Sequence, residues 1–163
     1  MRVRPATVED AAAIATVHVR TWQLTYRNQI PQVYLEQLDV TTRREQWQRR
    51  LRTRPAAVVL VLEHETAGVV GFVAAEAGEV QAIYILPAFQ GRGGGRRLMS
   101  AALDALRAGG DEGATLWVLA TNEPARRFYE AGGWHPDGTT RTEDFGGEPV
   151  EELRYRRRST IAE

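Results

Sequence analysis

The segment from Gly91 to Arg97, GRGGGRR, holds four glycines and three arginines in seven positions, between strand-forming residues and an amphipathic helix. A glycine-rich turn that opens a helix presents unpaired backbone N–H groups and the positive end of the helix dipole, so it suits a phosphate. A Walker loop is excluded because the chain has no lysine. A dinucleotide fingerprint is excluded because Arg96 or Leu98 stands where its last glycine belongs. The pattern Gln/Arg-x-x-Gly-x-Gly/Ala is matched at every position from Gln90 to Gly95.

A second group of residues with chemical potential lies further along the chain. Asn122, Ala125 and Tyr129 are spaced i, i+3 and i+7, which predicts one helix face with a small residue between two polar ones. A thin ligand fits along such a face, and the phenol of Tyr129 can act as a general acid. The alternatives are an ordinary helix N-cap for Asn122 and a core position for Tyr129.

Composition narrows the class of protein. A length of 163 residues suits one domain, and no apolar run approaches the ~20 residues of a membrane span. The absence of cysteine excludes disulfides and thiolate chemistry, and three scattered histidines predict no metal site. A net charge of zero argues against a nucleic-acid partner. Glu9 and Asp10 precede the first apolar stretch, so no signal peptide or membrane partner is expected and the predicted location is cytoplasmic.

The elements that must position these residues follow from periodicity and from helix-ending residues. A short strand is predicted at 2–6 and a helix, opened by Thr7, through Tyr26. Two further helical segments are predicted at 32–38 and 42–53. Three β-branched runs then predict a meander of strands at 58–62, 69–75 and 79–86.

After the glycine loop the pattern changes to alternating helices and strands. A helix is predicted up to the pair Gly109-Gly110, then a strand at 115–120 that lies parallel to the strand before the loop. A helix capped by Asn122 runs to Glu130. Two last strands are expected near Trp134 and at 150–156, with a glycine-rich hairpin region between them.

With these motifs in place, the chain resembles the GNAT acetyltransferase superfamily. The loop from Gln90 resembles its pyrophosphate loop, the stretch 83–87 (IYILP) its fourth strand, and 122–134 (NEPARRFYEAGGW) its second acyl-CoA motif. The resemblance implies an α/β (α+β) fold: a mixed, mostly antiparallel sheet of about seven strands, with a parallel pair splayed to form the acyl-CoA cleft, flanked by about four helices. It also implies a single domain over residues 1–158, followed by a polar tail at 159–163.

The same resemblance implies a site for acetyl-CoA as cosubstrate, with no metal. Backbone groups of Ile83 and Ile85 would pair with the pantetheine arm, the Ile85 N–H would polarise the thioester carbonyl, and Tyr129 would protonate the departing thiolate. The residues implied to contact the cofactor are Ile83, Ile85, Gln90, Gly91, Arg92, Gly93, Gly94, Gly95, Arg96, Asn122, Ala125, Phe128 and Tyr129. Arg97 is interpreted as solvated helix surface.

The acceptor side is less defined by the sequence. Glu79, on the strand that leads to the cleft, is the first candidate for the general base, although beside the Gly78 turn a solvated hairpin acid is the more ordinary interpretation. Weaker candidates are Glu151, Glu152 and His18. Trp22 and Tyr26 are i, i+4 neighbours that either line an acceptor pocket or serve as core aromatics. Asp39, Trp47 and the hairpin 137–147 are further candidates for that pocket.

These observations favour an N-acetyltransferase that moves acetyl from acetyl-CoA to a primary amine of a small molecule by direct attack in a ternary complex. Two alternatives stay open: acetylation of a protein or peptide N-terminus, and a non-catalytic acyl-CoA-binding sensor. The family resemblance also implies a homodimer.

Overall fold

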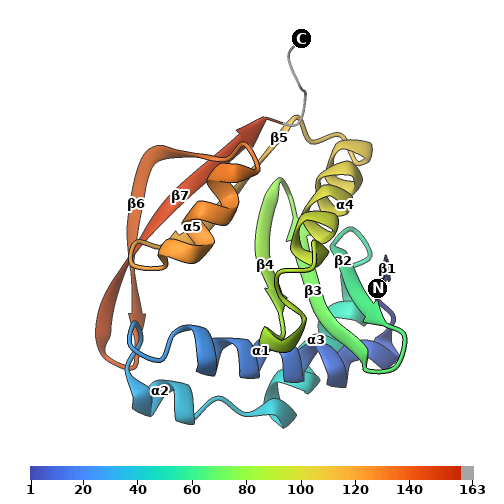
Figure 1. Cartoon of the computed structure of the whole chain (residues 1–163), viewed down its shortest axis with the longest axis horizontal. Coiled ribbons are helices and arrows are strands. Elements are labelled where there is room, and N and C mark those ends of the chain that lie inside the picture. Colours follow the sequence, from blue (N-terminus) through green and yellow to red (C-terminus); the bar gives the residue numbers. More distant parts are fainter. Residues whose placement is uncertain (159–163) are drawn as a thin grey trace.

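The computed structural model describes residues 1–158, and they form one seven-stranded sheet with helices on both faces (Figure 1). The predicted tail at 159–163 lies outside the described residues. The strand order is β1-β2-β3-β4-β5-β7-β6. The strands are β1 (Arg2–Pro5), β2 (Val58–His64), β3 (Gly68–Glu76), β4 (Glu79–Ile85), β5 (Gly113–Leu119), β6 (His135–Phe145) and β7 (Glu148–Arg158).

Five α-helices cover the sheet: α1 (Ala11–Thr25), α2 (Gln32–Glu36), α3 (Val40–Thr53), α4 (Gly94–Ala108) and α5 (Glu123–Ala131). These correspond to the five helical segments that the sequence pattern predicts, while the family resemblance implied about four; α2 is a short helix of five residues. Helices α1 and α3 pack on one face, where Trp47 and Phe72 lie in a buried cluster with residues of α1. Helix α4 packs on the other face against β2, β3 and β4.

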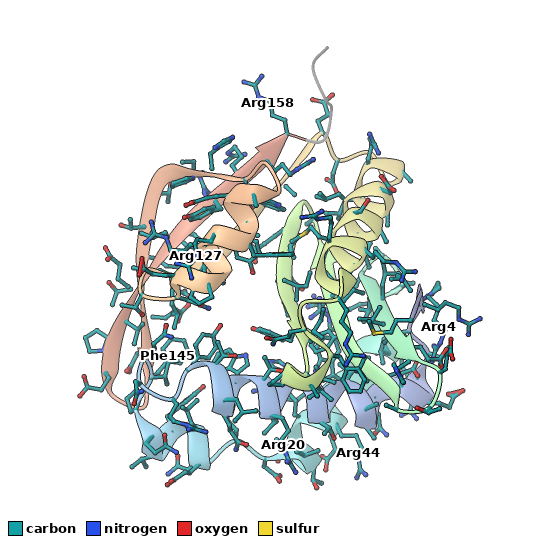
Figure 2. The ribbon with its side chains drawn as sticks, in the orientation of Figure 1. Arg4, Arg20, Arg44, Arg127, Phe145 and Arg158 are labelled. Carbon is teal, nitrogen blue, oxygen red and sulfur yellow. The ribbon has the colours of Figure 1, made fainter. Side chains whose placement is uncertain are left out.

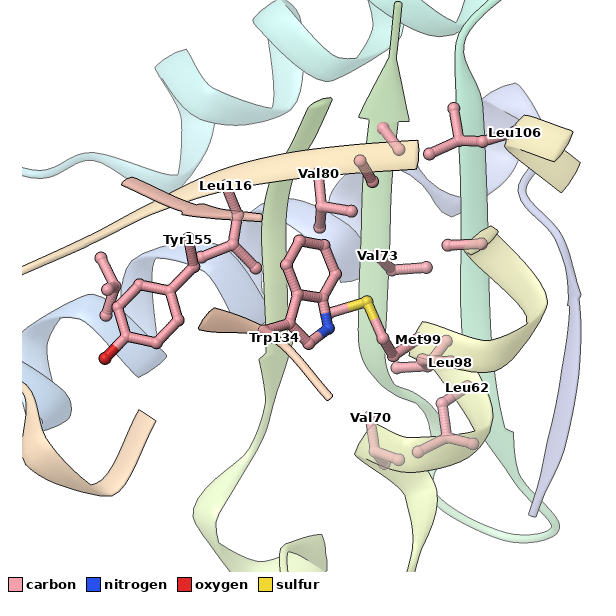
Figure 3. Packing of buried hydrophobic residues seen from close by; sticks show 14 residues of the cluster. Leu62, Val70, Val73, Val80, Leu98, Met99, Leu106, Leu116, Trp134 and Tyr155 are labelled. Atoms are coloured by element: carbon pink, nitrogen blue, oxygen red, sulfur yellow. The ribbon is translucent and has the colours of Figure 1, made fainter. Parts of the chain in front are cut away.

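The core beneath α4 holds together the two halves of the sheet, β1–β4 and β5–β7. Figure 3 shows Leu98 and Met99 from α4 gathered with Val73 from β3 and with Trp134. Trp134 is only 1% exposed and Tyr155 of β7 is fully buried, so both halves contribute large rings to one cluster. Burying rings of this size supplies much of the apolar area that stabilises such a core.

All neighbouring strands are antiparallel except β4 and β5, which are parallel. The predicted mixed sheet with one parallel pair is therefore confirmed. The parallel pairing follows from the crossover through α4, because a helix that returns the chain to the same edge of the sheet reverses its direction twice.

Two boundaries differ from the sequence-based expectation. The first helix is preceded by a 3₁₀ turn (Val8–Asp10), in which the Thr7 N–H donates to Asp10 Oδ2 at 2.8 Å. The strand expected near Trp134 extends through most of the glycine-rich hairpin region, because β6 runs from His135 to Phe145 and Gly146-Gly147, both at positive φ, turn the chain. No helix within residues 1–158 is long and apolar enough to cross a membrane.

Candidate functional site

The parallel strands β4 and β5 form a strand pair at only one position within the described residues. Their single registered pair is Glu79 with Thr115, where the Thr115 N–H donates to the Gly78 carbonyl at 2.8 Å. From there β5 pairs along its whole length with β7, while β4 continues to pair with β3. The two strands therefore diverge in a V, which Figure 1 shows between β4 and the β5–β7 pair. Among residues 1–158, no strand pairs with the edge of β4 that faces β5 beyond Glu79.

Strand β4 carries a bulge close to the point of divergence. Ala74 pairs with Ala82 and Ala75 pairs with Val80, so Gln81 is the extra residue on β4. The Gln81 side chain accepts a hydrogen bond from Arg50 of α3. A bulge increases local twist and redirects the strand, which helps β4 to leave β5.

Backbone polar groups at the end of β4 point into the V. The Leu86 N–H donates to the Val70 carbonyl of β3 at 2.9 Å. Because successive residues of a strand direct their polar groups to opposite sides, the N–H groups of Ile83 and Ile85 face away from β3, toward the gap. The Ile85 carbonyl already accepts from Gln90 Nε2 at 2.8 Å.

The glycine loop leads from this edge into α4. Gly91 and Gly93 adopt left-handed φ values of 76° and 82°, which L side chains rarely adopt. Gly94 is buried, and a Cβ there would lie 2.5 Å from Leu62 Cδ2. Gly93 is the N-cap of α4 and no side chain caps this terminus. The first-turn N–H groups of a 15-residue helix are thus open beside the loop.

The three arginines of the loop are placed differently. Arg97 donates to the Met1 carbonyl at 2.7 Å, so its guanidinium is engaged away from the loop. Arg92 donates to the Ala88 carbonyl at 3.3 Å and lies over the Phe89 ring. Arg96 is exposed and has no hydrogen-bond or ion-pair partner within residues 1–158. Of the three, Arg96 has the most freedom to pair with a bound anion.

Helix α5 supplies the opposite wall. Asn122 is its N-cap and is only 6% exposed, with Oδ1 accepting from the Ala125 N–H at 3.3 Å. The capping interpretation of Asn122 is therefore correct, and its amide NH2 stays available for a further bond. Phe128 reaches toward α4, because a Cβ on Gly95 would lie 3.2 Å from Phe128 Cζ. Ala125 and Tyr129 pack against the cluster beneath α4.

Tyr129 has the properties of a proton donor. Its ring contacts those of Phe128, Trp134 and Tyr155. Burial, with a smaller contribution from Tyr84, raises the pKa of the Tyr129 phenol well above its ordinary value. The raised pKa keeps this hydroxyl protonated at neutral pH. The hydroxyl is also available, because it has no hydrogen-bond partner among the described residues.

On the α1 side of the V lies a cavity of about 260 Å³. It brings together the three first candidates for the acceptor side: Trp22 from α1, Tyr26 directly after α1, and Glu79 from β4. Their roles stay predictions. The remaining walls come from four strands and the connection between α1 and α2, namely Ile30, Val80, Gln81, Tyr84, Trp117, Leu119, Arg141, Glu143, Phe145 and Glu152.

An aromatic network forms one wall of this cavity. Trp22 Nε1 donates to the Tyr84 hydroxyl at 2.9 Å, and the Trp22 and Tyr26 rings form a T-shaped pair at 5.0 Å. Trp22 also meets Phe145, labelled at the lower left of Figure 2, with ring centroids 5.8 Å apart. Tyr84 was not among the predicted site residues. Alternation along β4 was the available signal, because it places residue 84 on the face opposite to Ile83 and Ile85.

The charged groups of the cavity are unequal. Arg141 stacks on Trp117 at 4.2 Å and donates from Nε to Glu152 at 2.7 Å. Glu143 lies 3.7 Å from the same guanidinium. Glu79 has no side-chain partner within the described part of the chain. These pairings occupy Glu152 and leave Glu79 as the carboxylate with free lone pairs.

Of the other candidates, Glu152 and the hairpin 137–147 line the cavity, the hairpin through Arg141, Glu143 and Phe145. The remaining candidates, His18, Glu151, Asp39 and Trp47, do not. His18 is enclosed by aromatic rings, its Nδ1 accepts from Trp47 Nε1 at 3.2 Å, and burial lowers its pKa to about 3. Glu151 is exposed and does not line the cavity. Asp39 caps α3 and Trp47 is 4% exposed in the core, so neither contributes to the acceptor pocket as suggested by the sequence.

The residues of the V fit the cosubstrate that the sequence pattern implies. A row of outward-facing backbone amides, an uncapped helix N-terminus and a glycine loop with open space around Gly91 and Gly93 suit an amide-containing arm that ends in phosphates. Residues 1–158 hold no group of three or more His, Cys, Asp or Glu side chains arranged to bind a metal ion.

Comparisons with known proteins agree with this geometry. Residues 17–134 match the family model described as the acetyltransferase (GNAT) family. The chain is 33% identical over 138 residues to YuaI of Bacillus subtilis, named an uncharacterized N-acetyltransferase, covering 79% of this chain and 77% of YuaI.

Two solved structures show the same fold at low identity. The PaiA N-acetyltransferase of Thermoplasma acidophilum, in complex with coenzyme A, has a TM-score of 0.76 and 18% identity, covering 96% of this chain and 98% of its own. YncA of Salmonella typhimurium, with its cofactor acetyl-CoA, has a TM-score of 0.72 and 19% identity, covering 100% of this chain and 96% of its own. The chain belongs to the GNAT family of acetyltransferases, and it is therefore an acyltransferase.

Proposed function

We propose that the protein transfers an acetyl group from acetyl-CoA to a primary amine of a small molecule, by direct attack in a ternary complex. The observation that carries this proposal is the free edge of β4. It joins the uncapped N-terminus of α4 at one end to the 260 Å³ cavity with Glu79 at the other. The cosubstrate and the acceptor can therefore both reach the same edge of β4.

The chain's own groups account for binding of the cosubstrate. Backbone N–H groups of Gly91 to Arg96 and the α4 dipole hold the pyrophosphate, and Arg96 adds charge. The N–H groups of Ile83 and Ile85 hold the pantetheine arm, and the Ile85 N–H also faces the thioester carbonyl. Asn122, Ala125, Phe128 and Tyr129 flank the arm from α5. Acetyl-CoA, when bound, supplies an acetyl group activated as a thioester.

Two side chains move protons in this proposal. An amine enters the cavity mostly as an ammonium ion, and Glu79 accepts its proton so that the nitrogen lone pair is free. Tyr129 donates its phenolic proton to the departing sulfur, a role suited to a hydroxyl that stays protonated. The small size of the cavity, about 260 Å³, supports a small-molecule acceptor over a folded protein.

The first experiment is calorimetric titration of the protein with acetyl-CoA, beside NADH as a control ligand. Binding of acetyl-CoA alone, weakened by Gly93→Leu, is the expected result. Amines are then screened by release of free thiol, with peptides as competing acceptors. The chain has no lysine, so acetyl-lysine in a protein mixture comes from another protein. Absence of acetyl-CoA binding near millimolar concentration would refute the proposal, and binding without turnover on any amine would favour a sensor.

The role of Glu79 has its own test. Glu79→Gln keeps the shape of the side chain and removes its basicity, so kcat should fall by about 10²-fold. Glu65→Gln is the matched control, because Glu65 is exposed in the turn between β2 and β3. Equal activity in wild type and Glu79→Gln, at saturating amine, would remove Glu79 as the base.

A further inference from the structure

The acceptor cavity contains three neighbouring aromatic side chains, which we call the aromatic triad: Trp22, Tyr26 and Tyr84. Trp22 Nε1 donates to the Tyr84 hydroxyl at 2.9 Å, and the Trp22 and Tyr26 ring centroids lie 5.0 Å apart. All three line the cavity. The triad therefore presents a fixed arrangement of hydroxyl groups to whatever enters.

A count of hydrogens shows what the triad offers. Trp22 contributes one N–H, and each tyrosine contributes one O–H. The one internal bond uses the Trp22 N–H, and no acceptor for either hydroxyl hydrogen occurs among residues 1–158. The triad thus retains one donor group, the paired hydroxyls of Tyr26 and Tyr84, for a molecule in the cavity.

Packing holds this donor in place. The Tyr84 ring stacks on His18, with centroids 5.4 Å apart and planes inclined by 29°, and meets Phe72 edge-on. Trp22 and Tyr26 form a T-shaped pair at 5.0 Å. Burial raises the pKa of both tyrosines, so the hydroxyls keep their hydrogens at neutral and moderately alkaline pH. A donor immobilised in this way loses little entropy on binding.

The charges of the cavity determine which kind of acceptor oxygen, charged or neutral, a bound molecule can present to this donor. Three carboxylates, Glu79, Glu143 and Glu152, line the cavity with one guanidinium, that of Arg141. Arg141 is engaged by Glu152 at 2.7 Å and stacked on Trp117. An incoming carboxylate would meet this excess of negative charge with no free cation to pair it. A neutral oxygen avoids that repulsion.

We propose that the acceptor is a primary amine carrying a neutral hydrogen-bond-accepting oxygen near the amino group, as in an amino alcohol or an amino amide, and that the aromatic triad recognises this oxygen. The inference rests on the proposed function. With the amino group at Glu79, the oxygen of the same molecule accepts hydrogen bonds from both tyrosine hydroxyls of the triad, through its two lone pairs. Tyr84 and Tyr26 are in this sense specificity-determining residues.

The test compares three acceptors of similar shape: 2-amino-3-phenylpropan-1-ol, 2-phenylethylamine and phenylalanine. Their kcat/KM values are measured by thiol release with wild type, Tyr84→Phe and Tyr26→Phe. For each protein, kcat/KM for the amino alcohol is divided by kcat/KM for 2-phenylethylamine. Comparing this alcohol-to-amine ratio between proteins cancels the different basicities of the two amines. The alcohol-to-amine ratio should be about tenfold higher in wild type than in either variant, the size of one well-placed hydrogen bond. Phenylalanine should be the poorest acceptor.

Tyr34→Phe is the matched control, because Tyr34 packs on Phe145 outside the cavity lining, and its ratio should equal that of wild type. Thermal denaturation and acetyl-CoA titration of each variant come first; if one tyrosine variant does not fold, the other carries the comparison. The inference is overturned if the alcohol-to-amine ratio is unchanged in a folded tyrosine variant, or if phenylalanine is preferred by wild type. Failure of the proposed function looks different: no acetyl-CoA binding, or no thiol release with any of the amines.

Discussion

The side chain of Gln90 donates a hydrogen bond from Nε2 to the carbonyl oxygen of Ile85, across 2.8 Å. This contact fixes the start of the glycine loop to the end of β4. The groups that we propose to bind the phosphates and the thioester are thereby held in one geometry, although they belong to different elements. The first prediction concerns this link.

Removing the link should weaken acetyl-CoA binding without unfolding the protein. Gln90→Ala loses one hydrogen bond, worth about 1 kcal/mol, so Kd for acetyl-CoA should rise about fivefold in calorimetric titration. Gln90→Glu should be worse, because its carboxylate cannot donate and adds negative charge beside the phosphates. Two variants with wild-type affinity would show that the link plays no part in binding.

Arg96 and Arg97 provide a neighbouring matched pair. Arg97 is engaged with the Met1 carbonyl, whereas Arg96 has no partner among the described residues. Arg96→Ala should raise Kd for acetyl-CoA several-fold, and the difference from wild type should shrink at high salt because screening weakens exposed charge pairs. Arg97→Ala should bind like wild type. The reverse order of effects would place the diphosphate on the other side of the helix terminus.

Gly94 should be intolerant of a side chain for a packing reason. A Cβ there would lie 2.5 Å from Leu62 Cδ2 in a fully buried region, so Gly94→Ala should lower the free energy of unfolding by about 1 to 3 kcal/mol. Gly109→Ala, at the other end of α4, meets its neighbours at 3.5 Å and serves as the control. Adding Leu62→Val to Gly94→Ala should recover part of the loss in chemical denaturation. Strict additivity of the two changes would contradict the clash.

Tyr129 should affect turnover more than binding. Tyr129→Phe removes the proton donor and keeps the ring, so kcat should fall by about 10²- to 10⁴-fold while Kd for acetyl-CoA changes little. Burial raises the Tyr129 pKa, and the protonated form is the active acid. Deprotonation of Tyr129 should therefore cause no fall in wild-type kcat up to about pH 10, its ordinary pKa. A fall below pH 9 that is absent in Tyr129→Phe would argue against a raised pKa.

His18 should make stability sensitive to acid. Its folded pKa of about 3 lies below the ordinary 6.5, so the unfolded chain binds more protons between these values. Stability is then fully present above pH 6.5 and is lost as the pH falls toward 3, by about 2 kcal/mol between pH 6.5 and 5. His18→Gln keeps an acceptor for Trp47 and should flatten this slope in urea denaturation. An equal slope in both proteins would show that His18 is not the group responsible.

The sequence alone determined the local structure and the kind of site. Hydrophobic periodicity located the helices and strands, and the pattern Gln90 to Gly95 indicated a phosphate loop, because both depend on residues close together in the chain. The length of the strand before β7 was not predicted, since the polar, glycine-containing residues of the hairpin region hide a strand that is held by pairing with β7. Asn122 could be assigned a cap from its neighbours alone.

Only the tertiary structure decided what the acceptor side contains. Trp22, Glu79 and Glu152 are far apart in the sequence and meet because β4 leaves β5 after one pair, opening a space that α1 and the β6–β7 hairpin enclose. The hydrogen bond from Trp22 to Tyr84 and the hydrogen bond from Arg141 to Glu152 depend on that enclosure. Contacts of this kind arise from packing between distant segments, so no local pattern of residues specifies them.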